Sequence, residues 1–544
     1  MSQRSRIGIS LLAVCAAGAL SCADRDPGAA ARAEFDSLAA GALGLYRHLH
    51  PLRWSSLGLE GGDSLLFAFT DDEMTAAAAR LDSLLGALSS LPAASLDRRR
   101  LDDSFLLLDW IKGERFALGP DGACRNNPLL YCWMIEEALF QIPSRPAPPY
   151  PGEREQYARR LAALPALAGS AARLLEAPGA PLLEEAVVRL DRIAATIPAL
   201  ASEARRRYGE PVPGCAAAAG PVEALRAAFS GMLGGRPRGM TIMGLENLSL
   251  VLKYAEHLDA DPAALIAEAE SALQRIGRRP HPAGARRTAA AGPPADPDSI
   301  LSAIETAIAA RRLAGAGGGR SPVIAARPLY TPLRIPVDPF LTVPVTERRR
   351  ARAEFAGPPA GECATVCIVP AQPAADGDRL FYDLLLCCSA VTAPARDACR
   401  AGTTIRAVFS SETFRRGWET VVLQEIAPLF PERREAVARI EGEQRILDLA
   451  RMIVALRLHA GIYTAEAARA YLAETTGLPP ALLDGEVASA SASPAAAFDG
   501  IAALLIERLR KTPAGQGGAG GRLGDLLLEN GMLPLALIEK KLPS

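Results

Sequence analysis

Apolar residues recur at intervals of three and four along most of the first 275 residues, which is the period of amphipathic helices. Thr70, with Glu73 three positions later, forms a capping-box signature that predicts the start of one such helix. Residues 153–177 and 181–209 are predicted as two further long helices. We therefore expect an N-terminal helical region over residues 31–275 in which no segment needs to be a strand.

Proline, glycine and alanine interrupt this pattern over residues 276–330, which we interpret as loops around one short helix at 300–313. Beyond the loops, β-branched residues alternate with other residues in 333–346 and in 362–372. The segment 379–391 starts in a similar way. These three segments predict a small sheet.

Long helical patterns return from Arg415 to the end of the chain. Thr464 is placed to cap one of these helices, and Gly477 is placed to end it. We expect a C-terminal helical region over residues 331–544 that contains the small sheet. The predicted fold class is therefore mainly α.

The first residues read as an export signal. Two arginines precede the apolar run 7–20, which has 14 residues and is shorter than the roughly 20 that span a bilayer. Residues 19–22 resemble a bacterial lipobox, so we expect a signal peptide over 1–22, lipidation at Cys22 and a linker at 23–30. The expected location is periplasmic or outer-surface, anchored to a membrane through the lipid. Plain secretion and an uncleaved anchor are the alternatives.

Cysteines bear on the compartment, because export permits disulfides. Cys124 and Cys132 bracket seven residues and are candidates for closing a small loop. Five further cysteines lie between Cys363 and Cys399, without the C-x-x-C spacing of structural zinc sites. We favour disulfides or buried thiols over a zinc site for the cysteines of this chain.

Charge and motifs exclude several functions. The net charge is −1, with 60 basic and 61 acidic residues, so we expect no nucleic-acid partner. The glycine-rich run 315–319 follows a predicted helix and lacks the Gly-Lys-Ser/Thr ending of a phosphate-binding loop. The five histidines include no pair at the H-E-x-x-H spacing, and the G-x-S-x-G and S-x-x-K signatures are absent. The four tryptophans sit among apolar residues and are interpreted as core.

Several segments, taken in order, resemble one bacterial family. ARMIVALRLHAGIYTAEAARAYL at 450–472 is similar to a segment A-R-L-V-V-D-x-G-L-H-x-x-G-W-T-x-E-x-A-x-x-Y-L of that family, and LLENGMLPLALIE at 527–539 is similar to its closing L-x-N-G-x-L-P-L. Other matching positions are 100–110, 126–131, Tyr157, Arg160-Leu161, Leu164-Pro165 and Gly417-Trp418. The chain thus resembles the domain of unknown function 885 family over residues 31–542. Members of that family resemble zincin-type metallopeptidases and are often exported or lipid-anchored. The resemblance implies a large helical zincin-like fold with the small sheet beside a vestigial active-site cleft.

The family motif His-Glu-x-x-Pro-Gly-His, whose histidines look like zinc ligands and whose glutamate looks like the general base, is degenerate in this chain. The best register places Arg396 and Gly402 at the two histidine positions and Asp397 at the base. Arg416 stands where the glutamate of the family's E-G-W helix looks like the third ligand, and His459 alone matches a family histidine. Arginine has no lone pair to lend and glycine has no side chain, so we expect no metal and no other cofactor.

We therefore expect an exported, non-catalytic protein with a degenerate metallopeptidase-like fold. Its partners would be the membrane, through the lipid, and a peptide or an envelope protein. On this interpretation Arg396 and Arg416 are candidates for holding a carboxylate such as a peptide C-terminus. One alternative is an active hydrolase that uses Asp397, Glu412, Glu419 or Cys399 at a relocated metal site, or a cysteine nucleophile with His459. Another is a lipoprotein with no ligand at all.

Overall fold

The structure is a computed structural model, and it describes residues 28–277 and 404–542 together with three short strands between them. The gaps within those two ranges are residues 58, 144, 146–147, 177, 236–242, 410, 514 and 516–520. Between residues 277 and 404, the single residues 303 and 382 are also described. The predicted signal peptide, Cys22, most of the linker and most of the Pro/Gly/Ala-rich region lie outside the described residues.

The N-terminal half of the described chain is helical. Its helices are α2 (Ala29–Leu49), α3 (Pro51–Ser56), α4 (Asp71–Ser90), η1 (Ala93–Ser95), α5 (Arg98–Ala117), α6 (Ala123–Asn126), α7 (Pro128–Phe140), α8 (Glu153–Ala162), α9 (Leu164–Leu174), α10 (Ala180–Tyr208), η2 (Ala216–Ala218), α11 (Ala219–Gly234), α12 (Leu245–Glu256) and α13 (Pro262–Ile276).

The C-terminal half is also helical, which confirms the mainly α class. Its helices are α17 (Thr404–Val408), α18 (Glu412–Ile426), η4 (Ala427–Leu429), η5 (Pro431–Arg433), α19 (Arg434–His459), α20 (Ala465–Thr476), α21 (Pro480–Ala492), η6 (Pro494–Ala497), α22 (Phe498–Lys511), α23 (Gly521–Asn530) and α24 (Leu535–Lys541).

Three strands lie between the two helical halves in the chain. β1 (Arg327–Pro328), β2 (Arg352–Ala356) and β3 (Ala364–Val369) form one sheet in the order β1-β3-β2. β3 is parallel to β1 and antiparallel to β2. β3 falls inside the predicted segment 362–372, whereas β1 and β2 fall outside all three segments predicted as strand, β1 within the region predicted as loops. That the sheet borders a vestigial cleft stays a prediction.

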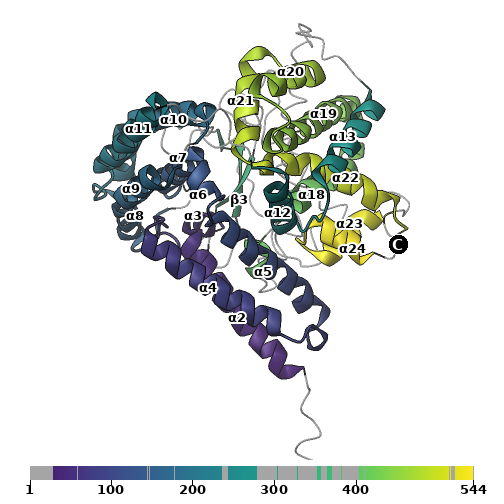
Figure 1. Ribbon diagram of the computed structural model, residues 1–544, viewed down its shortest axis with the longest axis horizontal. Helices are drawn as coiled ribbons and strands as arrows, with labels where there is room; N and C mark the ends of the chain where they lie inside the picture. Colours follow the sequence, from purple (N-terminus) through teal and green to yellow (C-terminus); the bar gives the residue numbers. More distant parts are fainter. Residues whose placement is uncertain are drawn as a thin grey trace, which may run out of the picture.

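Two hydrophobic cores divide the helices into two lobes, which stand side by side in Figure 1. The N-terminal core is built from α2 to α11, and the C-terminal core is built mainly from α18 to α24. Helices α12 and α13, which the sequence pattern grouped with the N-terminal region, contribute Leu248, Leu252, Leu265 and Ala269 to the C-terminal core. The N-terminal lobe therefore ends near residue 235, because the apolar faces of α12 and α13 pack against the other lobe.

Glu256, the last residue of α12, ties that helix to the start of α18. Its carboxylate accepts hydrogen bonds from the hydroxyls of Ser411 at 2.5 Å and Thr413 at 2.6 Å, and from the backbone N–H of Glu412 at 2.8 Å. The first N–H groups of a helix have no partner within the helix, so this carboxylate supplies a cap from a distant segment. Burial raises the pKa of Glu256 to about 7 in spite of these donors.

Short sequence motifs correctly predicted the ends of several helices. Both halves of the predicted capping box are present at α4, where Thr70 accepts from the N–H of Glu73. Thr464 caps α20, and Gly477 ends it with φ 65°. The single helix predicted over 153–177 is wrong, because the chain breaks at Ala163 into α8 and α9. The break comes two residues before Pro165, which has no N–H to continue a helix.

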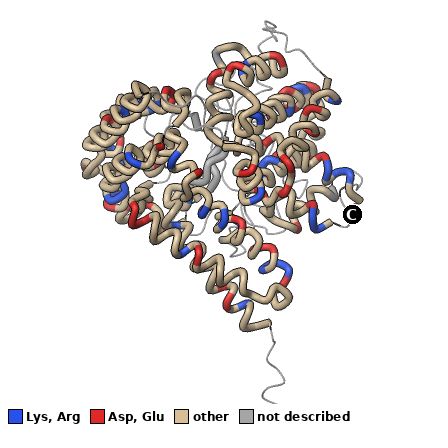
Figure 2. The backbone as a smooth tube through the Cα atoms, in the orientation of Figure 1, with Lys and Arg blue, Asp and Glu red and all other residues tan. Residues whose placement is uncertain are grey.

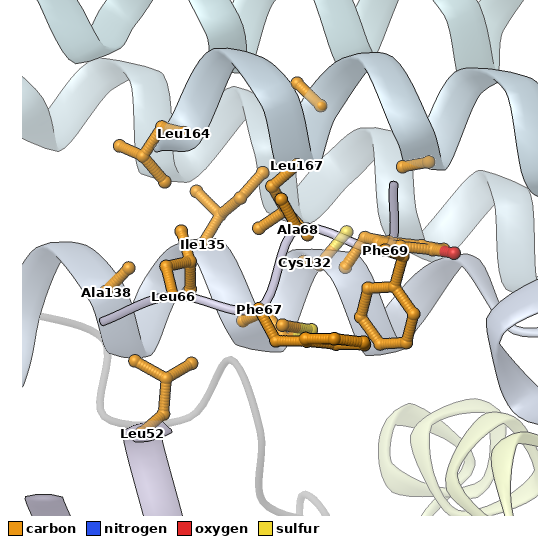
Figure 3. Close-up of a cluster of buried hydrophobic side chains, with 14 of the residues drawn as sticks. Leu52, Leu66, Phe67, Ala68, Phe69, Cys132, Ile135, Ala138, Leu164 and Leu167 are labelled. Atoms are coloured by element: carbon orange, nitrogen blue, oxygen red, sulfur yellow. The ribbon is translucent and has the colours of Figure 1, made fainter. Parts of the chain in front are cut away.

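The two cysteines of the N-terminal lobe that were candidates for a disulfide are buried thiols. Cys124 and Cys132 are free. The Sγ of Cys124 lies 3.3 Å from the carbonyl oxygen of Ala117, and that of Cys132 lies 3.6 Å from the carbonyl oxygen of Ala186. Figure 3 shows Cys132 among apolar side chains that include Phe67. The two cysteines do not close a loop because α6 and α7 direct their sulfurs to different backbone partners.

We expect neither of these thiols to react in the native protein. Burial raises the pKa of both Cys124 and Cys132, so the reactive thiolate is scarce. Maleimide labelling followed by peptide mass spectrometry should leave both unmodified until denaturant is added. Prompt native labelling of either residue, or a reducible link between the two peptides, would contradict the two buried free thiols.

Charged residues are distributed over both lobes. Figure 2 shows basic and acidic residues interspersed along the helices. Within the described residues, no single helix is long and apolar enough to cross a bilayer, although the bent pair 482–492 and 494–511 meets that test by length and composition.

Candidate functional site: a buried charge network around Arg416

Helix α18 carries the position that the family resemblance assigns to a third metal ligand. Ser411 caps the helix by accepting from the N–H of Phe414 at 2.9 Å. Residues three and four apart share one face of a helix, so Arg415 and Arg416 both reach Glu419. The face that holds Arg416 is turned into the C-terminal lobe, where that residue is 8% exposed.

Arg416 is held by two carboxylates from different helices. Its Nη2 donates to Oδ2 of Asp448 on α19 at 2.6 Å, and its Nη1 donates to Oε2 of Glu419 at 2.8 Å. Burial alone would lower the pKa of Arg416, but the carboxylates of Asp448, Asp499 and Glu419 outweigh it and hold that pKa well above its usual value. The guanidinium is therefore a fixed positive charge inside the lobe.

The network continues from Asp448 to a third helix. Asp448 also accepts from the side-chain amide of Gln444 and lies 3.8 Å from Nη1 of Arg451. Arg451 binds Glu486 of α21 with two parallel hydrogen bonds, from Nε at 2.6 Å and from Nη2 at 2.9 Å. We call Arg416, Glu419, Gln444, Asp448, Arg451 and Glu486 the Arg416 network. It joins α18, α19 and α21 by charge-assisted hydrogen bonds.

The carboxylates named for a relocated metal site are also paired with arginine. Glu412 accepts from Nε of Arg415 at 2.8 Å, and Glu419 accepts from Nη1 of the same residue at 2.6 Å. The charge of Arg415 lowers the pKa of Glu412. Among the residues that the structure describes, no group of three or more His, Cys, Asp or Glu side chains is placed to hold a metal ion. Asp397 and Cys399 lie outside the described residues.

The structure separates the two described positions of the predicted vestigial site. Arg416 is bound to Asp448, whereas His459 lies eleven residues further along α19, roughly 16 Å along the helix axis. His459 is 2% exposed, and its Nε2 is 3.1 Å from the carbonyl oxygen of Ala490. Arg396, Asp397 and Gly402 lie outside the described residues. His459 therefore lies in a buried position away from Arg416 and Asp448, against α21.

Arg416 does not present a free guanidinium to a ligand carboxylate. Both of its Nη atoms donate to carboxylates of the chain itself. That Arg416 binds a peptide C-terminus stays a prediction, and a ligand carboxylate would have to compete there with Asp448 and Glu419.

Because His459 is buried in its neutral form, we expect the free energy of unfolding to depend on pH. Burial lowers the pKa of His459 from 6.5 to about 4. Between pH 6.5 and pH 4 the unfolded chain binds a proton that the folded chain does not, so stability falls as the pH falls, by about 1.4 kcal/mol per pH unit. Above pH 6.5 this contribution is fully present.

We expect His459→Gln to remove that dependence. Urea unfolding at pH 7 and pH 5 should show wild type losing about 2 kcal/mol more than the variant between the two pH values. The contribution of Glu256 is common to both proteins and cancels in the comparison. Equal losses in the two proteins would mean that the His459 ring is already charged when folded.

A second cluster, which sequence reasoning missed, lies where α2, α3, α5 and α17 meet. Nε2 of His50 is 2.6 Å from Oε1 of Glu114, and Nε1 of Trp110 donates to the same oxygen at 3.1 Å. Rings of Tyr46 and His50 lie 4.8 Å apart, and those of Trp110 and Phe409 lie 4.9 Å apart.

We call Tyr46, His50, Trp54, Trp110, Glu114 and Phe409 the junction cluster. A signal for it exists in the sequence, because Tyr46, His50 and Trp54 recur every four residues. Arg53 lies beside this cluster, and its Nη2 is 3.7 Å from Oε1 of Glu412, the first residue of α18. The cluster therefore lies near the start of the helix that carries Arg416.

Comparison with known proteins supports the fold alone. No family model matches the chain, and no curated protein matches its sequence. A presumed lipoprotein of unknown function from Shewanella oneidensis aligns with TM-score 0.63 and 12% identity, over 93% of this chain and 99% of that one. A presumed lipoprotein from Colwellia psychrerythraea aligns with TM-score 0.69 and 14% identity, over 93% and 98%. The chain therefore has the fold of these two proteins over almost its full length.

Proposed function

We propose that this protein is an exported, lipid-anchored and non-catalytic relative of the domain of unknown function 885 family. It would keep a zincin-like helical scaffold and bind a peptide or an envelope protein. The observation that carries the proposal is the Arg416 network. At the position that the resemblance assigns to a metal ligand, a buried guanidinium bonds Asp448 and Glu419.

The physical argument is one of charge. Buried carboxylates need a positive partner, which is a metal ion in a metalloenzyme and a guanidinium here. Arg416 supplies that charge permanently and leaves no lone pair for a metal. The likeness of the whole fold to two presumed lipoproteins, together with the lipobox-like residues 19–22, supports export and anchoring at Cys22.

The junction cluster is the surface that we assign to partner binding. Its tryptophans are half-buried, and beside it the side chain of Arg53 is 48% exposed. Aromatic rings and arginine are the side chains that contribute most to binding energy at protein interfaces. Arg53 replaces Arg416 in this proposal as the arginine within reach of a ligand carboxylate.

Two measurements test the absence of catalysis. Metal analysis of the purified protein should find less than stoichiometric zinc, and peptidase assays from pH 5 to pH 9 should find no turnover that a chelator removes. Stoichiometric metal with chelator-sensitive hydrolysis would establish the alternative, an active metal-dependent hydrolase. In that case the ligands would have to include residues outside the described part of the chain.

Binding is tested with a library of short peptides that carry a free C-terminus. Arg53→Ala should weaken the best binder by about tenfold, which corresponds to about 1.4 kcal/mol. Arg469→Ala is a matched control, because the Arg469 side chain is 47% exposed and also has one carboxylate partner, Asp484. Equal affinity of wild type and Arg53→Ala for every peptide would reject Arg53 as the residue that binds the ligand carboxylate beside the junction cluster.

A further inference from the structure

The start of α2 and the turn between α4 and α5 form one end of the molecule. A Cβ built on Gly28 would lie 2.9 Å from the carbonyl oxygen of Ser95, so these two segments touch. Arg100 joins them, with Nε and Nη2 each 2.9 Å from the carboxylate of Asp36 and Nη1 2.5 Å from that of Asp97. We call residues 28–36 and 91–100 the α4–α5 tip. In Figure 1 it lies at the lower end of the molecule, where α2 begins.

The length of chain before the tip limits its distance from a membrane. Six Cα–Cα steps separate Cys22 from Gly28, and a fully extended chain spans about 21 Å over that number of steps. If Cys22 carries the lipid, Gly28 cannot lie further than this from the headgroups. This inference rests on the lipid anchor that is part of the proposed function.

The chemistry of the tip suits a phosphate-bearing surface. Pro92, Ala93 and Ala94 are small, apolar and exposed, and the exposed Arg98 and Arg99 follow within one turn of the start of α5. Arginine matches phosphate geometry with paired donors, and basic residues near an anionic membrane are attracted to its surface. The tip as a whole holds four arginines against three carboxylates, two of which Arg100 neutralises.

We propose that the α4–α5 tip faces the membrane and contacts anionic headgroups through Arg98 and Arg99. Helix α2 then acts as a spacer, because its 21 residues are about 31 Å long and only the first of them belong to the tip. Its far end carries Tyr46 of the junction cluster, and His50 follows as the C-cap residue. Tyr46 lies about 26 Å along the helix axis from the start of α2, so the binding surface is held away from the tip.

The test uses energy transfer from the protein to labelled lipid. A fluorescent amino acid is introduced at Ala94 in the tip or, as a control, at exposed Ala470 on α20, which lies at the opposite end in Figure 1. The acylated full chain is reconstituted in phosphatidylglycerol-containing vesicles that carry a headgroup-labelled acceptor. Transfer from position 94 should be several-fold stronger than transfer from position 470. Arg98→Glu with Arg99→Glu should reduce the transfer from position 94.

Three results decide the matter. Equal or weaker transfer from position 94, in vesicle-bound acylated protein, overturns the orientation. Transfer from position 94 that the double reversal leaves unchanged overturns the role of Arg98 and Arg99. Mass spectrometry that finds no acyl group on Cys22, with Cys22→Ala behaving as wild type, overturns the lipid anchor itself and so separates failure of the proposed function from failure of this inference.

Discussion

Arg416→Ala is expected to lower the free energy of unfolding by about 3–5 kcal/mol, because it leaves buried carboxylates without their partner. Among the described residues, Asp448 would keep Gln444 and the more distant Arg451, at 3.8 Å, and Glu419 would keep Arg415. Urea unfolding at pH 7, monitored by far-ultraviolet circular dichroism, measures the change.

The matched control for this change is again Arg469→Ala. The Arg469–Asp484 pair is exposed on both sides, so we expect a loss of about 1 kcal/mol or less. A double variant, Arg416→Met with Asp448→Asn, removes charge from both partners and should recover part of the loss. If Arg416→Ala and Arg469→Ala lower the free energy of unfolding by similar small amounts, the Arg416 network is solvated. That result would contradict the argument that the charge of Arg416 excludes a metal ion from this position.

Gly500→Ala is expected to destabilise the protein by about 3 kcal/mol, near the upper end of the usual cost of overpacking. Gly500 lies in α22, where it packs directly on the backbone of α19. A Cβ at this position would lie 2.6 Å from the carbonyl oxygen of Asp448 and 2.6 Å from the Cβ of Met452. Neither atom is the end of a flexible side chain, so α22 would have to move away from α19.

A second helical glycine provides a control of opposite sign. Gly442 lies in α19, and a Cβ added there meets nothing within 4 Å. Gly442→Ala should therefore stabilise the protein by about 0.5–1 kcal/mol, since alanine loses less backbone entropy on folding than glycine does. Thermal and urea unfolding of the two variants should show shifts in opposite directions. A gain of the same size for both would mean that helix propensity, and not close packing, decides the effect at Gly500.

These two sites explain how the C-terminal lobe is held together around α19. Gly500 allows α22 to approach the helix that carries Asp448, and Asp448 then reaches Arg416 on α18. A charge network of this kind stabilises one arrangement of helices only when every partner is present. At this position the structure therefore holds a charge network that joins α18, α19 and α21.

Much of the fold could be predicted from the sequence. The capping box at Thr70, the ends of α20 and the mainly α class follow from residues within four positions of each other, and local hydrogen bonds and side-chain periodicity depend on nothing further away. The absence of a histidine pair with metal-ligand spacing is likewise a property of the sequence alone. Even the break at Ala163 could have been predicted from Pro165.

Only the tertiary structure decided which distant groups meet. Arg416 and Asp448 are 32 residues apart, His50 and Glu114 are 64 apart, and Glu256 and Ser411 are 155 apart. Local pattern cannot pair such residues, because their contact depends on how whole helices pack and on the charges that become buried when they do. For the same reason the sequence left Cys124 and Cys132 as a possible disulfide, whereas packing turned their sulfurs to different carbonyl groups.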